Sequence, residues 1–274
     1  MLFAFVTDLR EMELTEEQLT AALAGRHLGF PIRYFPVTDS TNTQAWRLAL
    51  EGAPEGTAVV ADAQTRGKGR LTRSWESPPG TNIYTSLVLR PRIAPAAAPQ
   101  LTLVAGVAVA ELLAGYLPAG VTIKWPNDIL IGGKKICGIL TEMKSSAAGI
   151  DFIILGIGIN INAERAAFAP EIRETATSLK IATGTKFDRR ELISELFSRL
   201  EKWYSVFLNR GFPGVRETWL QYADIMERPV RVVFKEDVHS GIVTGIDDDG
   251  TLVMQDSQGV TRRVVAGDVY LLKE

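Results

Sequence analysis

The residues best suited to chemistry in this chain lie in one basic segment, residues 64–75, which reads Gln-Thr-Arg-Gly-Lys-Gly-Arg-Leu-Thr-Arg-Ser-Trp. Arginine offers a planar fork of donors and lysine a point charge, so such a segment can grip an anion from several sides. Its glycines would let the backbone approach a ligand closely. By charge alone, however, a solvated basic loop is the simpler interpretation. The residues concerned are Arg66, Gly67, Lys68, Gly69, Arg70 and Arg73.

Two further groups of polar residues are candidates for ligand binding. Asp39-Ser40-Thr41-Asn42 opens an expected helix, where free N–H groups favour an anion, although the same residues also serve as ordinary caps. A strand beginning near residue 121 is expected to stop at Pro126, because proline restricts its own φ and the residue before it. The residues expected at this rigid corner are Lys124, Asn127 and Asp128.

The elements that must position these residues are predicted from apolar periodicity and turn residues. The basic segment is expected to join two strands of one sheet, because apolar runs flank it on both sides. A nearly all-apolar run over 101–117 predicts a buried helix, and Asp188 is expected to cap a long amphipathic one. Strands are expected over residues 32–37, 57–63, 82–89, 121–125 and 151–160, and shorter helices over 15–24, 41–50 and 215–222.

Glycines mark a hairpin and a close approach in the second half of this sheet. Gly132-Gly133 predicts a tight turn, with Lys135 and Gly138 on the strand that follows. Gly156-x-Gly158 lacks the third glycine and the following helix of a dinucleotide-binding fingerprint. These glycines are therefore expected to accommodate a neighbouring group.

The composition predicts one large domain and one small domain. With 274 residues and 46% apolar content, the chain is long enough for both. Its net charge is −2, so the basic segment is a local concentration that suits a small anion better than a nucleic-acid track. Cys137 is the only cysteine, which excludes a disulfide within the chain and favours a reducing compartment.

Neither a signal peptide nor a membrane span is expected. The N-terminus has no charged leader and meets Asp8 early. No apolar run is expected to reach the roughly 18 residues that a membrane span needs. The location predicted from these features is cytoplasmic.

The sequence pattern changes near residue 226. From there on, short β-rich runs alternate with turns such as Asp247-Asp248-Asp249-Gly250. This pattern suits a small barrel. The predicted fold class is α+β, with a central mixed β-sheet flanked by helices over residues 1–225 and a small β-barrel over 226–274.

Five blocks, in order along the chain, resemble the biotin protein ligase family. They are Asp39-Ser-Thr-Asn42, the basic segment, Lys124-Trp-Pro-Asn-Asp128, Lys135 with Gly138, and Gly156-Ile-Gly-Ile-Asn160. Gly267-Asp-Val also resembles the end of the family's SH3-like domain, so the resemblance runs from about residue 32 to the C-terminus. It implies a class II synthetase-like catalytic domain, of the biotin/lipoate ligase kind, followed by an SH3-like barrel.

The resemblance implies a two-step reaction. The carboxylate of biotin attacks the α-phosphorus of ATP, and Mg²⁺ accompanies the nucleotide; the products are biotinyl-5′-adenylate and pyrophosphate. A lysine of the biotin carboxyl carrier protein of a carboxylase then attacks the mixed anhydride and releases AMP. A carboxylate is already nucleophilic, so the protein must mainly neutralise charge and position the two anions.

The family pattern also implies roles for individual residues. Lys135 and Arg70 are the expected catalytic residues, and no protein ligand for a metal is assigned. Asp128 could organise Lys135, serve the carrier lysine or serve Mg²⁺ indirectly. The residues expected to bind biotin are Ser40, Thr41, Asn42, Gln64, Lys68, Gly69, Arg70, Lys135 and Gly138, and those expected to bind ATP are Lys68, Arg70, Trp75, Asn127 and Asn160.

The chain departs from the family pattern in two places. Thr72 stands where the family's loop commonly has glycine, and threonine is costly there if the position needs φ > 0. The N-terminal DNA-binding domain of the bifunctional members has no counterpart, so DNA binding is not expected. The basic segment is expected to be mobile without ligand, and a homodimer through the sheet edge is implied by resemblance alone.

Two alternative functions are open to this sequence. A lipoate or octanoate ligase belongs to the same superfamily but lacks the Lys-Trp-Pro-Asn-Asp corner in this form. A nucleic-acid-binding module could use the basic segment and the barrel, but the net negative charge and the lack of interleaved aromatic residues oppose it.

Overall fold

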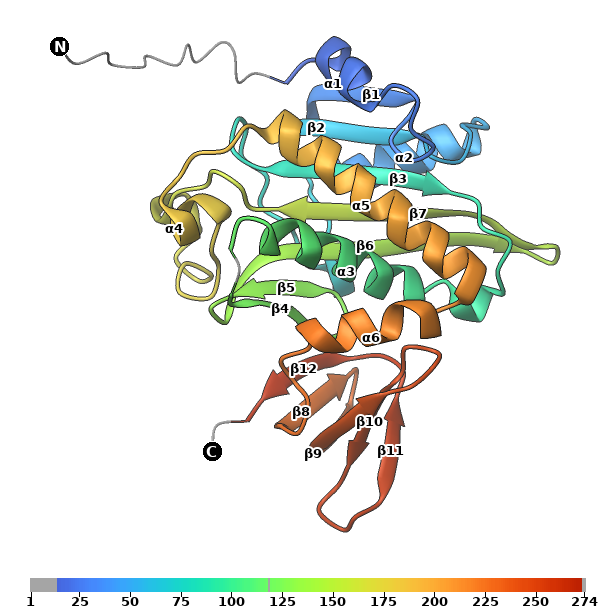
Figure 1. Ribbon diagram of the computed structural model, residues 1–274, viewed down its shortest axis with the longest axis vertical. Helices are drawn as coiled ribbons and strands as arrows, with labels where there is room; N and C mark the ends of the chain where they lie inside the picture. Colours follow the sequence, from blue (N-terminus) through green and yellow to red (C-terminus); the bar gives the residue numbers. More distant parts are fainter. Residues whose placement is uncertain (1–13, 118, 273–274) are drawn as a thin grey trace.

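A seven-stranded sheet forms the centre of the computed structural model, which describes residues 14–117 and 119–272 (Figure 1). Its strand order is β1-β2-β3-β7-β6-β5-β4. β1 and β2 are parallel and the other neighbours antiparallel, which confirms the predicted mixed sheet. The strands are β1 (Ile32–Thr38), β2 (Ala58–Gln64), β3 (Ile83–Leu89), β4 (Val121–Lys124), β5 (Asp128–Ile131), β6 (Lys134–Ser146) and β7 (Gly149–Ile159).

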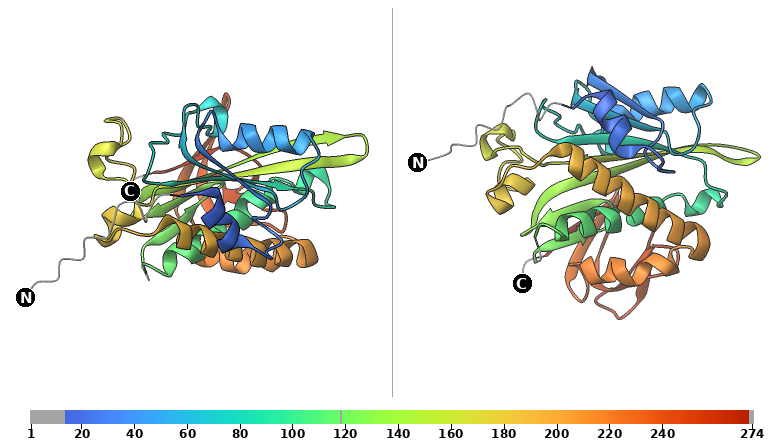
Figure 2. Two further views of the ribbon diagram at one scale, coloured as in Figure 1. Left: turned by 90° about the horizontal axis from the view of Figure 1, so that it is seen from above. Right: turned by 45° about the horizontal axis from the view of Figure 1, so that its top comes forward.

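Helices cover both faces of this sheet (Figure 2). Val59 and Val88 pack with Ala45 and Ala49 of one helix, α2 (Thr41–Leu50), in a small separate cluster. Their strand neighbours, such as Val60, point the other way into the main core, as the period of two in a strand requires. That opposite face is covered by α1 (Glu16–Leu23), α3 (Gln100–Ala114), α5 (Arg189–Arg210) and α6 (Pro213–Tyr222).

The apolar run ending in α3 corrects one expectation. In the described part of the chain, Pro95–Ala114 is long and apolar enough to cross a membrane by length and composition: it has 20 residues, and its most apolar window has a mean hydropathy of 1.6. The expectation that no run reaches this length was therefore wrong. In the structure 67% of that window is buried, because α3 packs between the sheet and the helices α5 and α6. A helix covered on most sides must be apolar nearly all round.

Local signals predicted most element ends. Asp188 Oδ1 accepts a hydrogen bond from Arg190 N at 2.8 Å and so caps α5, as expected. Gly132 and Gly133 have φ of 55° and 76° and form the predicted turn between β5 and β6. The short helices η2 (Arg70–Thr72), η3 (Pro95–Ala97), η4 (Arg165–Ala167) and α4 (Leu179–Thr183) were not predicted. The expectation about a signal peptide concerns residues 1–13, which lie outside the described residues.

The C-terminal runs form a second, antiparallel sheet with the order β11-β10-β9-β8-β12. It is joined to the central part by hydrogen bonds from Trp125 Nε1 to Gly250 O at 3.2 Å and from Arg216 Nε to Ile246 O at 2.6 Å. One buried cluster continues across both parts. The strands are β8 (Pro229–Phe234), β9 (Asp237–Ile246), β10 (Leu252–Gln255), β11 (Thr261–Val264) and β12 (Asp268–Leu271).

Candidate active site

The floor of the candidate site is one face of the central sheet, built from alternate residues of β6 and β7. Gly138 lies opposite Gly158 in this register, and Leu140 lies opposite Gly156. Residues two apart on a strand point to the same face, so these four line one surface. This is the face on which α2 packs, because Ile154, two residues before Gly156, belongs to the α2 cluster.

Glycines are required on this floor because side chains from elsewhere lie against it. A Cβ on Gly156 would lie 1.9 Å from Asn42 Oδ1, and one on Gly158 would lie 2.6 Å from Trp75 Nε1. A Cβ on Gly138 would lie 3.0 Å from Trp75 Cζ3. The prediction that Gly156-x-Gly158 accommodates a neighbour is therefore confirmed.

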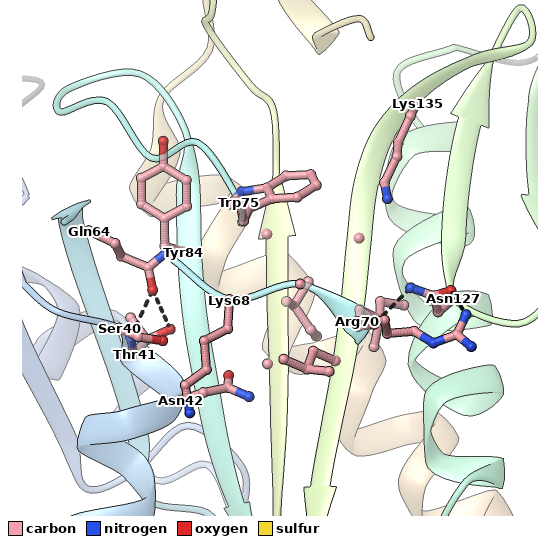
Figure 3. Close-up of a pocket in the computed structure, with 17 residues that line it drawn as sticks. Ser40, Thr41, Asn42, Gln64, Lys68, Arg70, Trp75, Tyr84, Asn127 and Lys135 are labelled. Carbon is pink, nitrogen blue, oxygen red and sulfur yellow. Dashed lines mark hydrogen bonds between the residues drawn. The ribbon is translucent and has the colours of Figure 1, made fainter. Parts of the chain in front are cut away.

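Amide and hydroxyl groups at the start of α2 form one end of the site (Figure 3). Gln64 Oε1 accepts hydrogen bonds from Thr41 N at 2.8 Å and from Thr41 Oγ1 at 3.2 Å. Gln64 Nε2 donates to Ser77 Oγ at 2.8 Å. Ser40 and Thr41 are buried, so this end presents polar groups that are already oriented.

The carboxylate of Asp39 holds this helix start in place. Its Oδ1 accepts hydrogen bonds from Ser40 N at 2.7 Å and from Gln44 Nε2 at 2.9 Å. Burial alone would raise the pKa of Asp39, but these hydrogen bonds and the nearby Arg47 outweigh it and lower the pKa below its usual value. The Ser40 side chain makes no capping hydrogen bond. Asp39 accepts from the N–H just before the helix, and Gln64 accepts from the first helical N–H, that of Thr41.

The basic segment folds back on itself between β2 and β3. Gly69 N donates to Arg73 O at 2.7 Å, and Trp75 N donates to Gly67 O at 2.9 Å. At its tip, Thr72 has φ of 63°, the left-handed region. The concern that this position needs φ > 0 is confirmed, and a residue with a Cβ costs about 1 kcal/mol there.

Arg70 links the basic segment to the two sheets. Its guanidinium donates to Asn127 Oδ1 at 2.7 Å and lies 3.5 Å from Asp268 Oδ1, and it also reaches Gly267 O at 3.3 Å. Arg73 makes a hydrogen bond with Asp268 Oδ2, and this hydrogen bond raises the pKa of Arg73. A carboxylate at the start of β12 therefore faces two cations of the basic segment.

Lys135 lies at the start of β6, at the end of the site away from Ser40 and Thr41 (Figure 3). Its Nζ is 2.7 Å from Asp128 Oδ1 and 5.5 Å from the ring centroid of Trp75. Among the roles left open for Asp128, contact with Lys135 is the one the structure contains. Trp75 Nε1 is buried without a hydrogen-bond partner in the described residues, so it can donate to a ligand.

Two cavities lie on either side of Lys135 and Trp75, which line both of them. The first has about 50 Å³ of free space and the second about 260 Å³. All the predicted site residues except one line the first cavity: Ser40, Thr41, Asn42, Gln64, Lys68, Gly69, Arg70, Trp75, Asn127, Lys135 and Gly138.

The exception is Asn160, which lines the second cavity. It is 5% exposed, and its Nδ2 donates to Thr177 O at 3.0 Å, so its amide ties down the segment that follows β7. That segment supplies Phe168 and Ile172 to the wall of the second cavity. These two residues were not predicted, because no periodic pattern marks them.

Other residues of the first cavity were also missed, and for some of them a signal existed. Gly156 and Gly158 follow from the spacing of two that places them beside Gly138 on one face. Tyr84, 1% exposed, donates its hydroxyl to Pro78 O at 3.0 Å, and nothing in the sequence distinguishes it from a core tyrosine.

The Lys-Trp-Pro-Asn-Asp corner positions Asn127 between the floor and Arg70. Asn127 Nδ2 donates to Ile139 O at 3.1 Å, which leaves its Oδ1 to accept from Arg70. Trp125 is 3% exposed and donates a hydrogen bond to Gly250 O, so its role is architectural.

Comparison with known proteins connects this geometry to a family. The model of the biotin/lipoate A/B protein ligase family matches residues 34–160, and that of the biotin protein ligase C-terminal domain matches residues 225–272. Among solved structures, the biotin protein ligase from Aquifex aeolicus in complex with biotin and ATP has a TM-score of 0.76 and 29% identity, covering 89% of this chain and 99% of that one.

Curated relatives agree. The bifunctional ligase/repressor BirA of Bacillus subtilis is 39% identical over 94% of this chain and 79% of its own length. The biotin–[acetyl-CoA-carboxylase] ligase of Paracoccus denitrificans is 36% identical over 85% of this chain and 97% of its own length. The chain therefore belongs to the biotin protein ligase family of enzymes.

Proposed function

We propose that the protein activates biotin as biotinyl-5′-AMP and transfers it to a lysine of the biotin carboxyl carrier protein of a carboxylase. The observation that carries this proposal is that two neighbouring cavities share Lys135 and Trp75 in their walls. One cavity ends in oriented amides and hydroxyls, and the other has apolar walls, so an acyl group and a nucleotide could meet at a shared cation. Relatives named biotin–[acetyl-CoA-carboxylase] ligases support the same reaction.

The first cavity suits biotin. A ureido ring has both donors and acceptors, and Ser40, Thr41 and Gln64 offer both kinds of group. Free space of about 50 Å³ holds only one or two water molecules. We therefore expect the basic segment to move outward when biotin enters.

The second cavity suits the adenosine of ATP. Phe168, Ile172 and the indole of Trp75 offer apolar surface to a base, while Arg73 and Lys135 bring positive charge to one side. The triphosphate would then lie at the border, with Lys135 of the shared wall and Arg70 of the first cavity toward the α-phosphate.

The chain's own residues would assist both steps by position and charge. In the first step the biotin carboxylate attacks the α-phosphorus and pyrophosphate leaves, and Lys135 offsets the gathering negative charge. Asp128, 2.7 Å away, holds the Lys135 ammonium at the border. In the second step the carrier amine attacks the acyl carbonyl, loses a proton and expels AMP.

Mg²⁺ would accompany ATP in this proposal. The described residues contain no group of three or more His, Cys, Asp or Glu that could hold a metal ion. Mg²⁺ is commonly held by substrate phosphates with one or two carboxylates and water, so it would enter on the triphosphate.

Biotin-dependent exchange of labelled pyrophosphate into ATP tests the first step. We expect exchange with biotin and none without it, followed by a gain in mass of an added carrier domain equal to one biotinyl group. Exchange that follows lipoate or octanoate instead of biotin would make the proposal wrong, as would biotinyl-AMP formation without transfer to the carrier.

A further inference from the structure

Glu142 is a charged residue of β6 that lines neither of the two cavities. It follows Gly138 and Leu140 on the same face of β6, and it lies opposite Ile154 of β7. Its side chain is 30% exposed, and it lines a hollow between the floor and the outer side of the basic segment. It lies at the edge of the first cavity, where it contacts Asn42 and Lys68, two of the residues expected to bind biotin.

Both carboxylate oxygens of Glu142 contact a side chain of the site. Oε1 lies 3.2 Å from Lys68 Nζ, and Oε2 accepts a hydrogen bond from Asn42 Nδ2 at 2.7 Å. Lys68 accordingly extends toward Asn42 and away from Trp75 (Figure 3). One carboxylate therefore joins the basic segment to the first turn of α2 beside the cavity.

The contact with Asn42 has a further consequence. A carboxylate can only accept hydrogen bonds, so it requires the NH₂ group of Asn42 to face it. The Asn42 Oδ1 then faces Ser86 Oγ at 2.6 Å, and Ser86 is completely buried. Asn42 is 4% exposed and lines the cavity, so Glu142 decides which hydrogen-bonding pattern its amide presents there.

We propose that Glu142 is a positioning residue of the acyl pocket: its carboxylate fixes the orientation of the Asn42 amide and holds Lys68 beside it. The inference rests on the proposed function in assuming that the ligand of this pocket is biotin. Glutamine is the informative replacement, because it keeps the size of the side chain but can present either oxygen or NH₂ to Asn42. In Glu142→Gln the orientation of Asn42 is no longer imposed, and Lys68 loses its partner charge.

Two measurements test the proposal, one without any ligand. Trypsin should cut after Lys68, Arg70 or Arg73 about threefold faster in Glu142→Gln than in the wild type, since a partly exposed ion pair is lost. In pyrophosphate exchange the KM for biotin should rise about tenfold, as loss of a charge-assisted hydrogen bond predicts, while kcat and the KM for ATP stay within about twofold. Glu142→Asp keeps an acceptor-only charge, so its cleavage rate and its KM for biotin should lie between those of the wild type and those of Glu142→Gln.

Asp224→Asn is the matched control, because it removes one carboxylate of an exposed ion pair, 3.1 Å from Arg228. It should leave both readouts unchanged. The proposal would be overturned if Glu142→Gln left the KM for biotin or the rate of cleavage unchanged. It would also be overturned if kcat fell by as much as the KM for biotin rose and Tm fell with it. If the wild type itself shows no exchange with biotin, the proposed function is wrong, and the ligand-free cleavage still decides whether Glu142 holds the segment.

Discussion

Lys135 is the side chain best placed to neutralise negative charge in a site that is lined, in the described part of the chain, by no histidine or cysteine. It lines both cavities and pairs with Asp128, so its ammonium is held where two anions would meet. Positive charge that is fixed before the reaction needs no reorganisation when negative charge gathers in the transition state.

Lys135→Ala should therefore slow biotin-dependent pyrophosphate exchange by about 10²–10³-fold, the usual loss when one such charge-stabilising group is removed. Its side chain is 36% exposed, so the free energy of unfolding should fall by no more than about 1 kcal/mol. Lys134→Ala, one residue earlier on β6 and outside both cavities, is the control and should retain activity. Wild-type exchange in Lys135→Ala would remove this residue from the active site.

Thr72 has a backbone conformation that is poorly suited to its β-branched side chain. Its φ of 63° is costly for threonine and free of penalty for glycine. Thr72→Gly should raise the free energy of unfolding by up to about 1 kcal/mol in urea denaturation. Thr185, also exposed, is not among the residues with positive φ, and Thr185→Gly should instead destabilise. Equal destabilisation by both changes would contradict the strain argument.

At the scale of elements, the sequence predicts best where one local signal decides. Periodicity and caps located α5, and glycines located the β5–β6 turn. Eleven residues of the first cavity could be predicted because each stands in a block with a recognisable pattern, whereas Tyr84, which lines the same cavity, has no such signal. The second cavity could not: Phe168 and Ile172 lie in an irregular segment whose path depends on Asn160 and on contacts distant in sequence. The apolar stretch that ends in α3 was underestimated because the turn η3 before the helix extends it to 20 residues, although α3 itself has only 15.

The two-residue periodicity of β6 and β7 gives a test of the floor. In Gly158→Ala the new methyl would lie 2.6 Å from Trp75 Nε1, so the indole must leave its place over the strands. We expect a changed tryptophan emission and a rise of about tenfold or more in the KM for biotin or ATP, because the border of the two cavities moves. Gly106→Ala is the control: its Cβ would meet no atom closer than 3.8 Å, and alanine favours a helix. Emission and KM values unchanged in Gly158→Ala would show that the indole does not lie on this floor.

At the scale of the whole molecule, the C-terminal sheet takes part in the site instead of standing apart from it. Asp268, at the start of β12, faces Arg70 and Arg73, and Gly267 O accepts from Arg70 as well. These two residues come nearly 200 positions after the basic segment, as the separation of 198 between Arg70 and Asp268 shows. No local pattern could reveal the contact. The basic segment is thus held by four parts of the fold: the start of α2 through Gln64, the floor through Glu142, the corner through Asn127, and β12 through Asp268.

Asp268→Asn tests this last contact. It should free Arg73 and weaken the hold on Arg70, so trypsin should cut the ligand-free basic segment about threefold faster, and the difference from wild type should shrink as salt screens the wild-type pair. Asp256→Asn is the matched control within the same sheet, because Asp256 pairs with Arg262 at 3.0 Å and does not face the basic segment. Biotin and ATP together should slow cleavage in both the wild type and Asp268→Asn, since ligand anions then take the place of the carboxylate. If cleavage of Asp268→Asn equals that of the wild type at every salt concentration, the C-terminal sheet does not hold the segment, and its contact with Arg70 is only a packing contact.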